Sequence, residues 1–367
     1  MISYKISNAI VVPINLQKGE SALVFKSRTV FIGIDVHRKS YSISCICEGV
    51  VVKRLRMTAE PEVLIQLIKD SFPEANIKSA YESGFSGFAL HRKLFASGIN
   101  NIVIHAASLA MRVSDRVKTD AKDSKKLAEQ LAAGMLKGIR IPSEEQEFSR
   151  LYTRTRSQLI KMRSRTMLQI RMRLLQFGLM PIDYDRPLNR AFVRKILPTL
   201  PLKLKISIEI HLANWEHIQL QILKVEKLIK EQNKDNPIVS FYRKVSGLGS
   251  VTAGSLVAEL GDLLQFKNER ALFSFIGLTP REYSSGERKR LGSISKKGNP
   301  AVRHMLIQLA WRAIKKDPKL NEKFTALAGR IGKRKAIVAI ARKLIGIIRA
   351  TIRNNTEYQV NYRATGK

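Results

Sequence analysis

The sequence predicts an α/β domain, then a long helical hairpin, then a mostly helical C-terminal domain. The first prediction rests on a run of strand-forming residues at 29–36 that ends in Asp35, and on short apolar runs that alternate with helical patterns up to residue 140. The other two rest on apolar residues at helical spacing between residues 141 and 353. A chain of 367 residues with 44% hydrophobic content has room for two or three domains with real cores.

The predicted first domain, residues 29–140, has three strands before its first long helix. These strands, at 29–36, 40–47 and 50–57, form a meander with a turn at Glu48-Gly49. The elements that follow are a helix at 60–72, a strand at 77–81, a helix at 87–97, a strand at 99–104 and a helix at 120–134. This order of elements is that of a ribonuclease-H-like domain.

Four acidic residues converge at one end of that predicted sheet. Asp35 ends the first strand, and Glu82 ends the fourth strand, which lies beside it in this type of sheet. Asp120 and Asp123 are three positions apart on a helix and therefore share one face. The negative charges of such a cluster repel one another, and in phosphoryl-transfer sites two bound Mg²⁺ ions usually neutralise them. The alternative is that Asp35 caps a turn and that Asp120 and Asp123 open a solvated helix.

The charge of the chain indicates a polyanionic partner. Sixty-five lysines and arginines stand against 30 acidic residues, which gives a net charge of +35. Such an excess opposes a compact fold through self-repulsion unless a polyanion neutralises it, so nucleic acid is the expected partner. An anionic membrane surface is a weaker alternative, because no apolar stretch approaches the ~18 residues needed to span a bilayer.

The cysteines and the two ends of the chain carry less information. Cys45 and Cys47 lie two apart in a predicted strand, where neither an unstrained disulfide nor a zinc site is expected. They fit a reducing cytosol, and we expect a cytoplasmic protein associated with the nucleoid. Residues 1–28 lack the features of a secretory signal and are predicted to form an N-terminal arm, and residues 354–367 a flexible tail.

Residues 141–236 predict two long helices. Ser143 and Gln146 form a capping-box pattern that opens the first helix, which runs to Phe177. Every ionised residue between positions 150 and 173 is basic, so we expect this helix to bind phosphates or an acidic partner. The alternative is a basic face that is only solvated. The candidate nucleic-acid contacts here are Arg150, Arg154, Lys161, Arg163, Arg165 and Arg171. The second helix has an apolar stripe from residue 208 to 229 that pairs with the first helix as a hairpin or across a dimer.

The predicted C-terminal domain spans residues 237–353 and contains two further motifs. Gly247 and Gly249 bracket a leucine between helices, which suits a helix-hairpin-helix that holds a DNA phosphate on backbone N–H groups; an ordinary helical connection is the alternative. Ser284, Ser285 and Gly286 form a loop in a basic tract whose candidate contacts are Arg281, Lys289, Arg290, Lys296, Lys297 and Arg303. Nearby cations would lower the cost of a serine alkoxide, although such a loop alone is usually only a loop.

These motifs together resemble the DEDD transposases of the IS110 family of bacterial insertion sequences, which includes the Piv-type DNA invertases. The matching pieces are Gly33-Ile34-Asp35-Val36-His37, Glu82-Ser83-Gly84, Arg116-Val117-Lys118-Thr119-Asp120-Ala121-Lys122-Asp123, Gly247-Leu248-Gly249, and Gly277-Leu278-Thr279-Pro280 through Ser285-Gly286. They span residues 30–310, and their joint order is specific although each piece is weak.

The resemblance implies a RuvC-like domain in which Asp35, Glu82, Asp120 and Asp123 bind Mg²⁺, with Mn²⁺ as a substitute. It implies that Ser285, directly before Gly286, is the nucleophile that forms a covalent phosphoserine with cleaved DNA; Ser284 is the alternative register. It also implies recombination of double-stranded DNA under the guidance of a structured bridge RNA. The long helices and the need to hold two DNA partners predict a homodimer or homotetramer.

Three function classes follow from these observations. The first is a transposase that cuts and rejoins DNA through Ser285 with help from the metal site. The second is a metal-dependent nuclease, such as a four-way-junction resolvase, in which Ser285 is idle, or a Piv-like invertase without an RNA guide. The third is a non-catalytic nucleic-acid-binding scaffold, which the charge supports and the four converging carboxylates do not.

Overall fold

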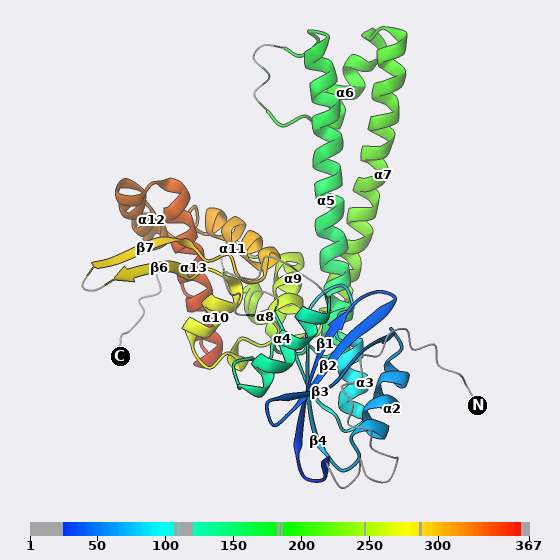
Figure 1. Cartoon of the computed structure of the whole chain (residues 1–367). Helices are drawn as coiled ribbons and strands as arrows, with labels where there is room; N and C mark the ends of the chain where they lie inside the picture. Colours follow the sequence, from blue (N-terminus) through cyan, green and yellow to red (C-terminus); the bar gives the residue numbers. More distant parts are fainter. Residues whose placement is uncertain are drawn as a thin grey trace. The chain divides into compact units, whose positions relative to one another are not determined.

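The computed structural model describes residues 25–105, 109, 120–181, 184, 186–245, 247–285 and 288–360 (Figure 1). The chain divides into two compact units, Met1–Ile141 and Pro142–Lys367. Most of the predicted N-terminal arm, residues 1–24, and the last part of the predicted tail, residues 361–367, lie outside the described residues. No helix in the described part of the chain is long and apolar enough to cross a membrane.

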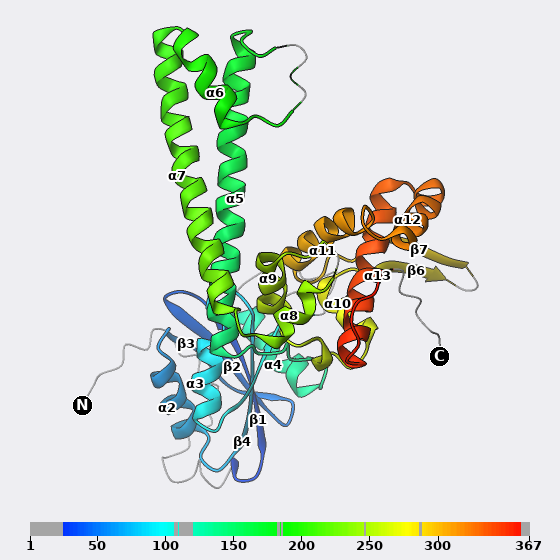
Figure 2. The same ribbon diagram turned by 180° about the vertical axis from the view of Figure 1, so that it is seen from behind.

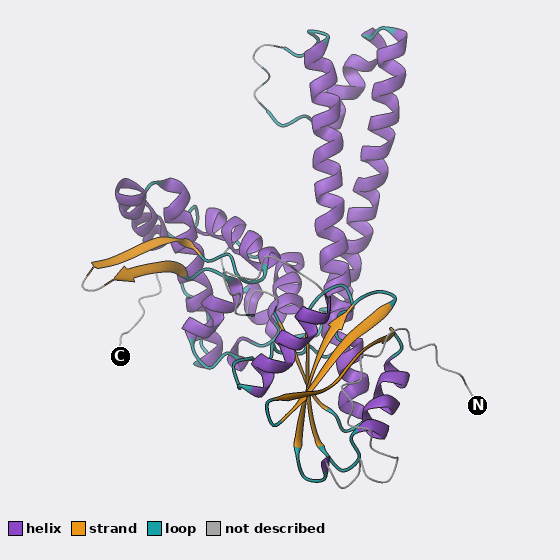
Figure 3. Cartoon of the chain, in the orientation of Figure 1, coloured by secondary structure: helices purple, strands orange, loops and turns teal. Residues whose placement is uncertain are grey.

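The first unit is built on a five-stranded mixed sheet in the order β3-β2-β1-β4-β5. Strand β1 runs parallel to β4, β4 runs parallel to β5, and β2 is antiparallel to both β1 and β3. The strands are β1 (Thr29–Val36), β2 (Ser40–Cys47), β3 (Val50–Thr58), β4 (Asn76–Glu82) and β5 (Asn100–Ile104). The prediction of an α/β domain is confirmed, and this mixed sheet is compatible with a ribonuclease-H-like domain (Figure 3).

Helices cover both faces of this sheet. On one face, α2 (Pro61–Ser71) and α3 (Ala89–Ala96) bury Leu64 and Leu94 in a core with Ile32 and Ile34 of β1. On the other face, α4 (Asp120–Ala132) contacts β1, β2 and β4 (Figure 2). Alternate residues of a strand point to opposite faces, so β1 contributes core side chains to α2 and α3 and its remaining positions to α4.

Gly33 allows α4 to lie directly on β1. A Cβ atom at this position would lie 2.1 Å from the backbone oxygen of Ser124 and 2.6 Å from the backbone nitrogen of Ala128. Beside this contact, the hydroxyl groups of Ser44 and Ser124 hydrogen-bond at 2.9 Å and tie the helix to β2. The glycine therefore serves a close approach of helix and strand backbones, a common reason for a glycine within a strand.

The second unit begins with a helical hairpin. Helices α5 (Glu144–Gln176) and α7 (Leu202–Gln232) pack on one another, with α6 (Arg190–Ile196) and the short helix η2 (Leu197–Thr199) between them in sequence (Figure 1). The Ser143 side chain accepts a hydrogen bond from the Gln146 amide at 3.1 Å, as the capping pattern predicts. The predicted stripe of α7 is buried, and its N-terminal half packs with Ile170 and Leu174 of α5 within one chain.

The remaining elements of the second unit form a separate, mostly helical core. They are α8 (Pro237–Arg243), α9 (Ser250–Leu260), η3 (Leu263–Gln265), α10 (Glu269–Ile276), β6 (Pro280–Ser285), β7 (Arg288–Ile294), α11 (Pro300–Ala313), α12 (Pro318–Ile331) and α13 (Lys333–Arg353). Within residues 354–360, assigned from the sequence to a flexible tail, Tyr358 is buried in this core and donates a hydrogen bond to Asp317 at 2.7 Å.

The segment around Ser284 and Ser285 differs from the predicted loop. Both residues end strand β6, which pairs antiparallel with β7 so that Ser285 lies opposite Arg288. Charged and polar residues make up most of the sequence of these short strands, so it shows no apolar alternation that would indicate them.

The contact of α4 with β1 predicts that Gly33→Ala destabilises the first unit. A methyl group would overlap the helix backbone, and overpacking of this kind costs about 1–3 kcal/mol. Urea unfolding of the full chain, followed by circular dichroism, measures the loss. Gly329→Ala in α12 is the control, because nothing lies within 4 Å of its added Cβ. Equal stability of the two variants would contradict the proposed role of Gly33.

Candidate functional site

Strand β1 and helix α4 bring acidic side chains together at one edge of the sheet. Asp35 is two residues beyond Gly33 and therefore points to the same face of β1, toward α4. Asp120 and Asp123 both lie in the first turn of α4. The packing that Gly33 permits thus sets the distance between the strand carboxylate and the helix carboxylates.

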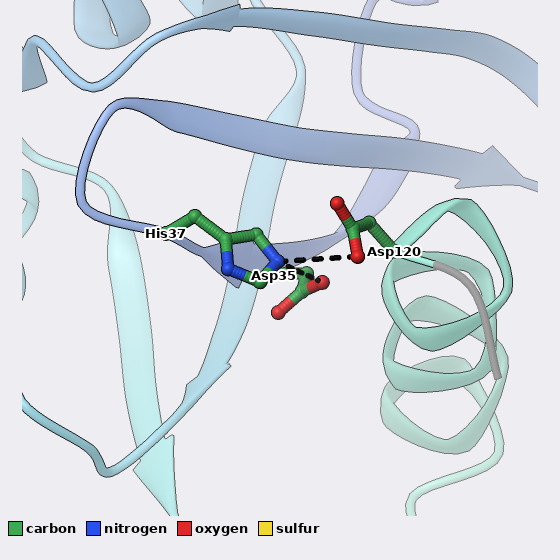
Figure 4. A group of neighbouring side chains, drawn as sticks. All are labelled: Asp35, His37 and Asp120. Atoms are coloured by element: carbon green, nitrogen blue, oxygen red, sulfur yellow. Dashed lines mark hydrogen bonds and ion pairs between the residues drawn. The ribbon is translucent and has the colours of Figure 1, made fainter.

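His37 links two of these carboxylates (Figure 4). Its Nε2 atom lies 3.1 Å from Oδ2 of Asp35 and 3.3 Å from Oδ1 of Asp120. Among the described residues, Asp35, His37 and Asp120 form the group of ligating side chains close enough to share one metal ion. On the outer side, an Arg56 guanidinium nitrogen lies 3.7 Å from Oδ2 of Asp120.

Burial raises the pKa of the Asp35 carboxyl above its ordinary value of 3.8. The negative charges of Asp120 and Asp123 raise this pKa further, whereas His37 opposes the shift through its charge and its hydrogen bond. A carboxylate that is 22% exposed and faces two others is costly to ionise alone. A divalent cation would remove that cost, and carboxylate oxygens are ligands for such cations, so these residues fit a divalent metal site.

Glu82 has its position set by strand register. Tyr81 of β4 pairs with Ile34 of β1 in a parallel ladder, so Glu82 is level with Asp35 and on the same face of the sheet. Of the four predicted carboxylates, Asp35 and Asp120 therefore belong to the close group. Asp123 acts on Asp35 through its charge, and Glu82 is placed by the strand pairing. The assignment of all four as metal ligands stays a prediction.

The sequence reasoning missed His37 and Arg56. His37 follows Asp35 by two positions, and that spacing after a strand-terminal aspartate was a usable signal. Arg56 lies on β3 opposite Ser42, which in turn pairs with Asp35 across β2. The approach of Arg56 to Asp120 depends on this strand register and on the packing of α4 on the sheet. Local sequence patterns show neither of these.

The basic residues predicted on α5 fall into two groups. Arg154 makes a bidentate pair with Glu259 of α9, at 2.9 and 3.2 Å, and Arg150 donates to the backbone oxygens of Ala258 and Glu259. Glu259 is 1% exposed, so these two arginines neutralise a buried carboxylate.

Two further arginines of α5 have partners inside the unit, and other basic side chains are exposed. Arg163 donates to Gln219 at 3.0 Å, and Arg171 donates to backbone oxygens of Tyr184 and Arg186. Lys161 and Arg165 are exposed, as is Arg154 despite its pair with Glu259.

The C-terminal candidates are also divided by their contacts. Arg303 donates to the backbone oxygens of Ile276 and Gly298 and so supports the fold. Exposed side chains of the predicted set are Arg281, Arg290, Lys296 and Lys297. The side chains of Ser284, Ser285 and Lys289, and all of Gly286, lie outside the described part of the structure.

The two glycines of the predicted hairpin motif have different roles. Gly247 has φ +87°, in the left-handed region that favours glycine, and a Cβ there would lie 3.2 Å from Cβ of Arg312. Gly249 is the N-cap residue of α9, and nothing would lie within 4 Å of an added Cβ. The turn between α8 and α9 therefore packs against Arg312 at Gly247, whereas an added side chain at Gly249 would meet open space.

Comparison with known proteins gives consistent matches over both units. A family model of IS110 DEDD enzymes, described as "Transposase", matches residues 32–178, and a second, described as "Transposase IS116/IS110/IS902 family", matches residues 241–325. The protein y4qE of Sinorhizobium fredii, named as a transposase, is 27% identical over 89% of this chain and 89% of its own length. The transposases for insertion sequence elements IS1533 of Leptospira borgpetersenii and IS1111A of Coxiella burnetii are 26% and 29% identical. They match 86% and 66% of this chain, and 93% and 68% of their own lengths.

The raised pKa of Asp35 predicts the effect of neutralising this residue. The folded chain holds the Asp35 proton more tightly than the unfolded chain, so this contribution to stability is present below pH 3.8 and is lost as pH rises through the folded-state pKa. At pH 7 without metal, Asp35→Asn should therefore raise the melting temperature, by roughly 2–5 °C.

The same variant tests whether the site binds a cation. Mn²⁺ should raise the melting temperature of the native chain and leave that of Asp35→Asn unchanged, as measured by thermal unfolding with and without the ion. Asp70→Asn, an exposed carboxylate of α2, is the matched control. An equal response to Mn²⁺ in the native chain and in Asp35→Asn would rule out a metal site at Asp35.

Proposed function

This chain belongs to the IS110 family of transposases, and we propose that it is a site-specific DNA recombinase that cuts and rejoins DNA through a covalent phosphoserine at Ser285. The observation that carries this proposal is the grouping of Asp35, His37 and Asp120 at the edge of a ribonuclease-H-like sheet. Carboxylates held close together are electrostatically unfavourable and would also repel a bound polyanion, so a purely structural nucleic-acid scaffold gives no reason for them. In finer terms, we propose that the first domain is RuvC-like and that α5 and α7 form a coiled coil.

Asp35 and Asp120 would hold Mg²⁺, with Glu82 and Asp123 completing the ligand set and Mn²⁺ as a substitute. The bound ions would supply positive charge to the scissile phosphate as negative charge develops on its oxygens. His37 positions the two carboxylates through its Nε2 atom, and Arg56 holds the outer oxygen of Asp120. These contacts keep the ligands in place before DNA arrives, which reduces reorganisation during the reaction.

The serine step is a transesterification. The Oγ atom of Ser285 attacks the phosphorus, the bond from phosphorus to one sugar oxygen breaks, and the proton released from the serine is balanced by the proton that the leaving sugar oxygen takes up. In the reverse sense, a sugar hydroxyl attacks the phosphoserine and restores a phosphodiester. The bond energy is conserved, so rejoining requires no ATP.

Basic surfaces on both parts of the second unit would contact nucleic-acid backbones. We assign this role to Lys161 and Arg165 on α5 and to the exposed cations that flank the β6–β7 hairpin, because lysine and arginine contacts to phosphate supply most of the affinity for nucleic acids. The turn between α8 and α9, with Gly249 at the start of α9, would act as a helix-hairpin-helix. The target sites would be read by base pairing of a bridge RNA, and the protein would act in the cytoplasm at the nucleoid.

A metal-dependent nuclease is the second candidate function. The grouping of Asp35, His37 and Asp120 lies entirely within the first unit, and such a site can activate water for cleavage without a serine. In that case Ser285 is idle, and cleavage leaves no covalent link between protein and DNA. A Piv-like invertase differs from the first proposal only in the absence of the RNA guide.

We also propose that two copies of the chain associate through the helical hairpin. Large apolar side chains remain exposed on α5 and α7, where a monomer would leave them in water. They are Phe148, Leu151, Met162, Leu168, Met172 and Leu175 on α5, and Leu202, Ile206, Ile210, Leu220 and Leu223 on α7. A second copy is the occupant that strand exchange requires, because two DNA partners must be held together.

A trapping assay separates the recombinase from the nuclease. Full-length protein is incubated with Mg²⁺, candidate RNA and labelled element-junction DNA, and denaturing electrophoresis then detects a covalent protein–DNA adduct. The adduct should disappear in Ser285→Ala and fall at least about 100-fold in Asp120→Asn, the scale typical for loss of a transition-state contact. Ser284→Ala is the matched control for register. Cleavage without an adduct, unaffected by Ser285→Ala, would establish the nuclease instead.

Charge placed on the apolar face of α5 should separate the copies. Met162→Glu with Met172→Glu buries two unpaired charges in the proposed interface, so light scattering should show the mass of a single chain. Asn321→Glu with Thr325→Glu makes the same charge change at exposed polar positions of α12, outside the hairpin, and should leave the assembly intact. A native chain that is already monomeric in this measurement would refute the interface.

A further inference from the structure

A pocket in the second unit is lined by none of the residues assigned to the proposed reaction. It has a volume of about 500 Å³ and is formed where the start of α10 meets the end of α13. Lys267, Asn268, Glu269 and Arg270 contribute from the first of these segments, and Arg349 and Arg353 from the second. Four of these six side chains carry a positive charge and one carries a negative charge, so the pocket favours an anion.

Arg349 gives this pocket a buried donor. The residue is 7% exposed, and one of its terminal nitrogens donates to the backbone oxygen of Phe266 at 2.8 Å. Its Nε atom is buried and has no hydrogen-bond partner among the described residues. The guanidinium as a whole lines the pocket and keeps a positive charge that one backbone carbonyl does not neutralise, so an anion bound in the pocket would stabilise it.

The start of α10 adds backbone donors on the same side. The Asn268 side chain accepts a hydrogen bond from the Ala271 amide at 2.9 Å and so caps the helix. The amides of residues 269 and 270 are in the first turn, where no carbonyl of the helix itself is available to them. They add partial positive charge, which favours an anion at this helix end.

The one acidic residue sits at the edge of the pocket. A Cβ placed on Gly346 would lie 3.2 Å from Oε1 of Glu269, so this carboxylate packs against α13 one turn before Ala350. Arg270 and Arg353 are exposed and line the same pocket as Arg349. A buried arginine with two exposed arginines in the same pocket is suited to tetrahedral oxyanions.

We propose that this pocket binds one phosphate group of a DNA backbone, with Arg349 as the fixed donor and Lys267, Arg270 and Arg353 as the surrounding cations. The assignment to DNA rests on the proposed function, whereas the anion site itself rests only on these contacts. A phosphate held here would fix the register of the duplex on the C-terminal core without reading its sequence.

Two measurements on the full chain test the proposal. Arg270→Gln with Arg353→Gln removes two exposed cations and leaves the buried Arg349 and the fold intact. Binding of a duplex oligonucleotide, followed by fluorescence anisotropy, should weaken about tenfold, and the slope of affinity against salt should fall by about one phosphate contact. Inorganic phosphate, compared with chloride at equal ionic strength, should raise the melting temperature of the native chain and not that of the variant.

Arg330→Gln with Arg334→Gln is the matched control, because both residues are exposed in the same unit and the charge change is identical. Equal loss of duplex binding in both double variants would overturn the proposal, since the effect would then be one of overall charge. Loss of binding to an RNA hairpin with unchanged duplex binding would overturn the assignment to DNA. Neither measurement involves cleavage or an adduct, so the outcome is independent of the serine mechanism.

Discussion

The close contact between Gly33 and α4 is the constraint on which the candidate site depends. The carboxylates come from a strand and from a helix, and only an approach of the two backbones without an intervening side chain brings Asp120 within 3.3 Å of His37. The hydrogen bond between Ser44 and Ser124 then fixes the helix along the strand direction. A small residue at one position therefore governs the geometry of ligands that come from two separate elements.

The local patterns predicted the elements that carry the chemistry. A strand that ends in a carboxylate and a helix with two acids in its first turn were visible in the sequence, because both follow from local periodicity. The spacing of His37 after Asp35 was visible, whereas the contact of His37 with Asp120 was not, since that contact depends on the docking of α4. The β6–β7 pairing was also missed, because the sequence of those strands shows no apolar alternation. The side chain of Ser285 lies outside the described structure, so its role stays a prediction.

The large positive charge of the chain is not all directed outward. Arg150 and Arg154 on α5 were predicted as phosphate contacts from their one-sign helix face, yet they surround Glu259, more than a hundred positions away in sequence. A buried carboxylate needs such partners, and one-dimensional charge counting cannot show which cations it recruits. A basic helix can therefore serve its own domain and a polyanion at different points along its length.

Glu259 also accepts a hydrogen bond from Asn299, whose side chain caps α11 and whose backbone amide donates to Phe275 of α10. The foot of α5 is thus joined through one buried polar network to the segments on both sides of the β6–β7 hairpin. Removing any one of these partners would leave the buried Glu259 carboxylate short of a donor, so the packing at the foot of α5 and the packing at the base of the hairpin are coupled in free energy.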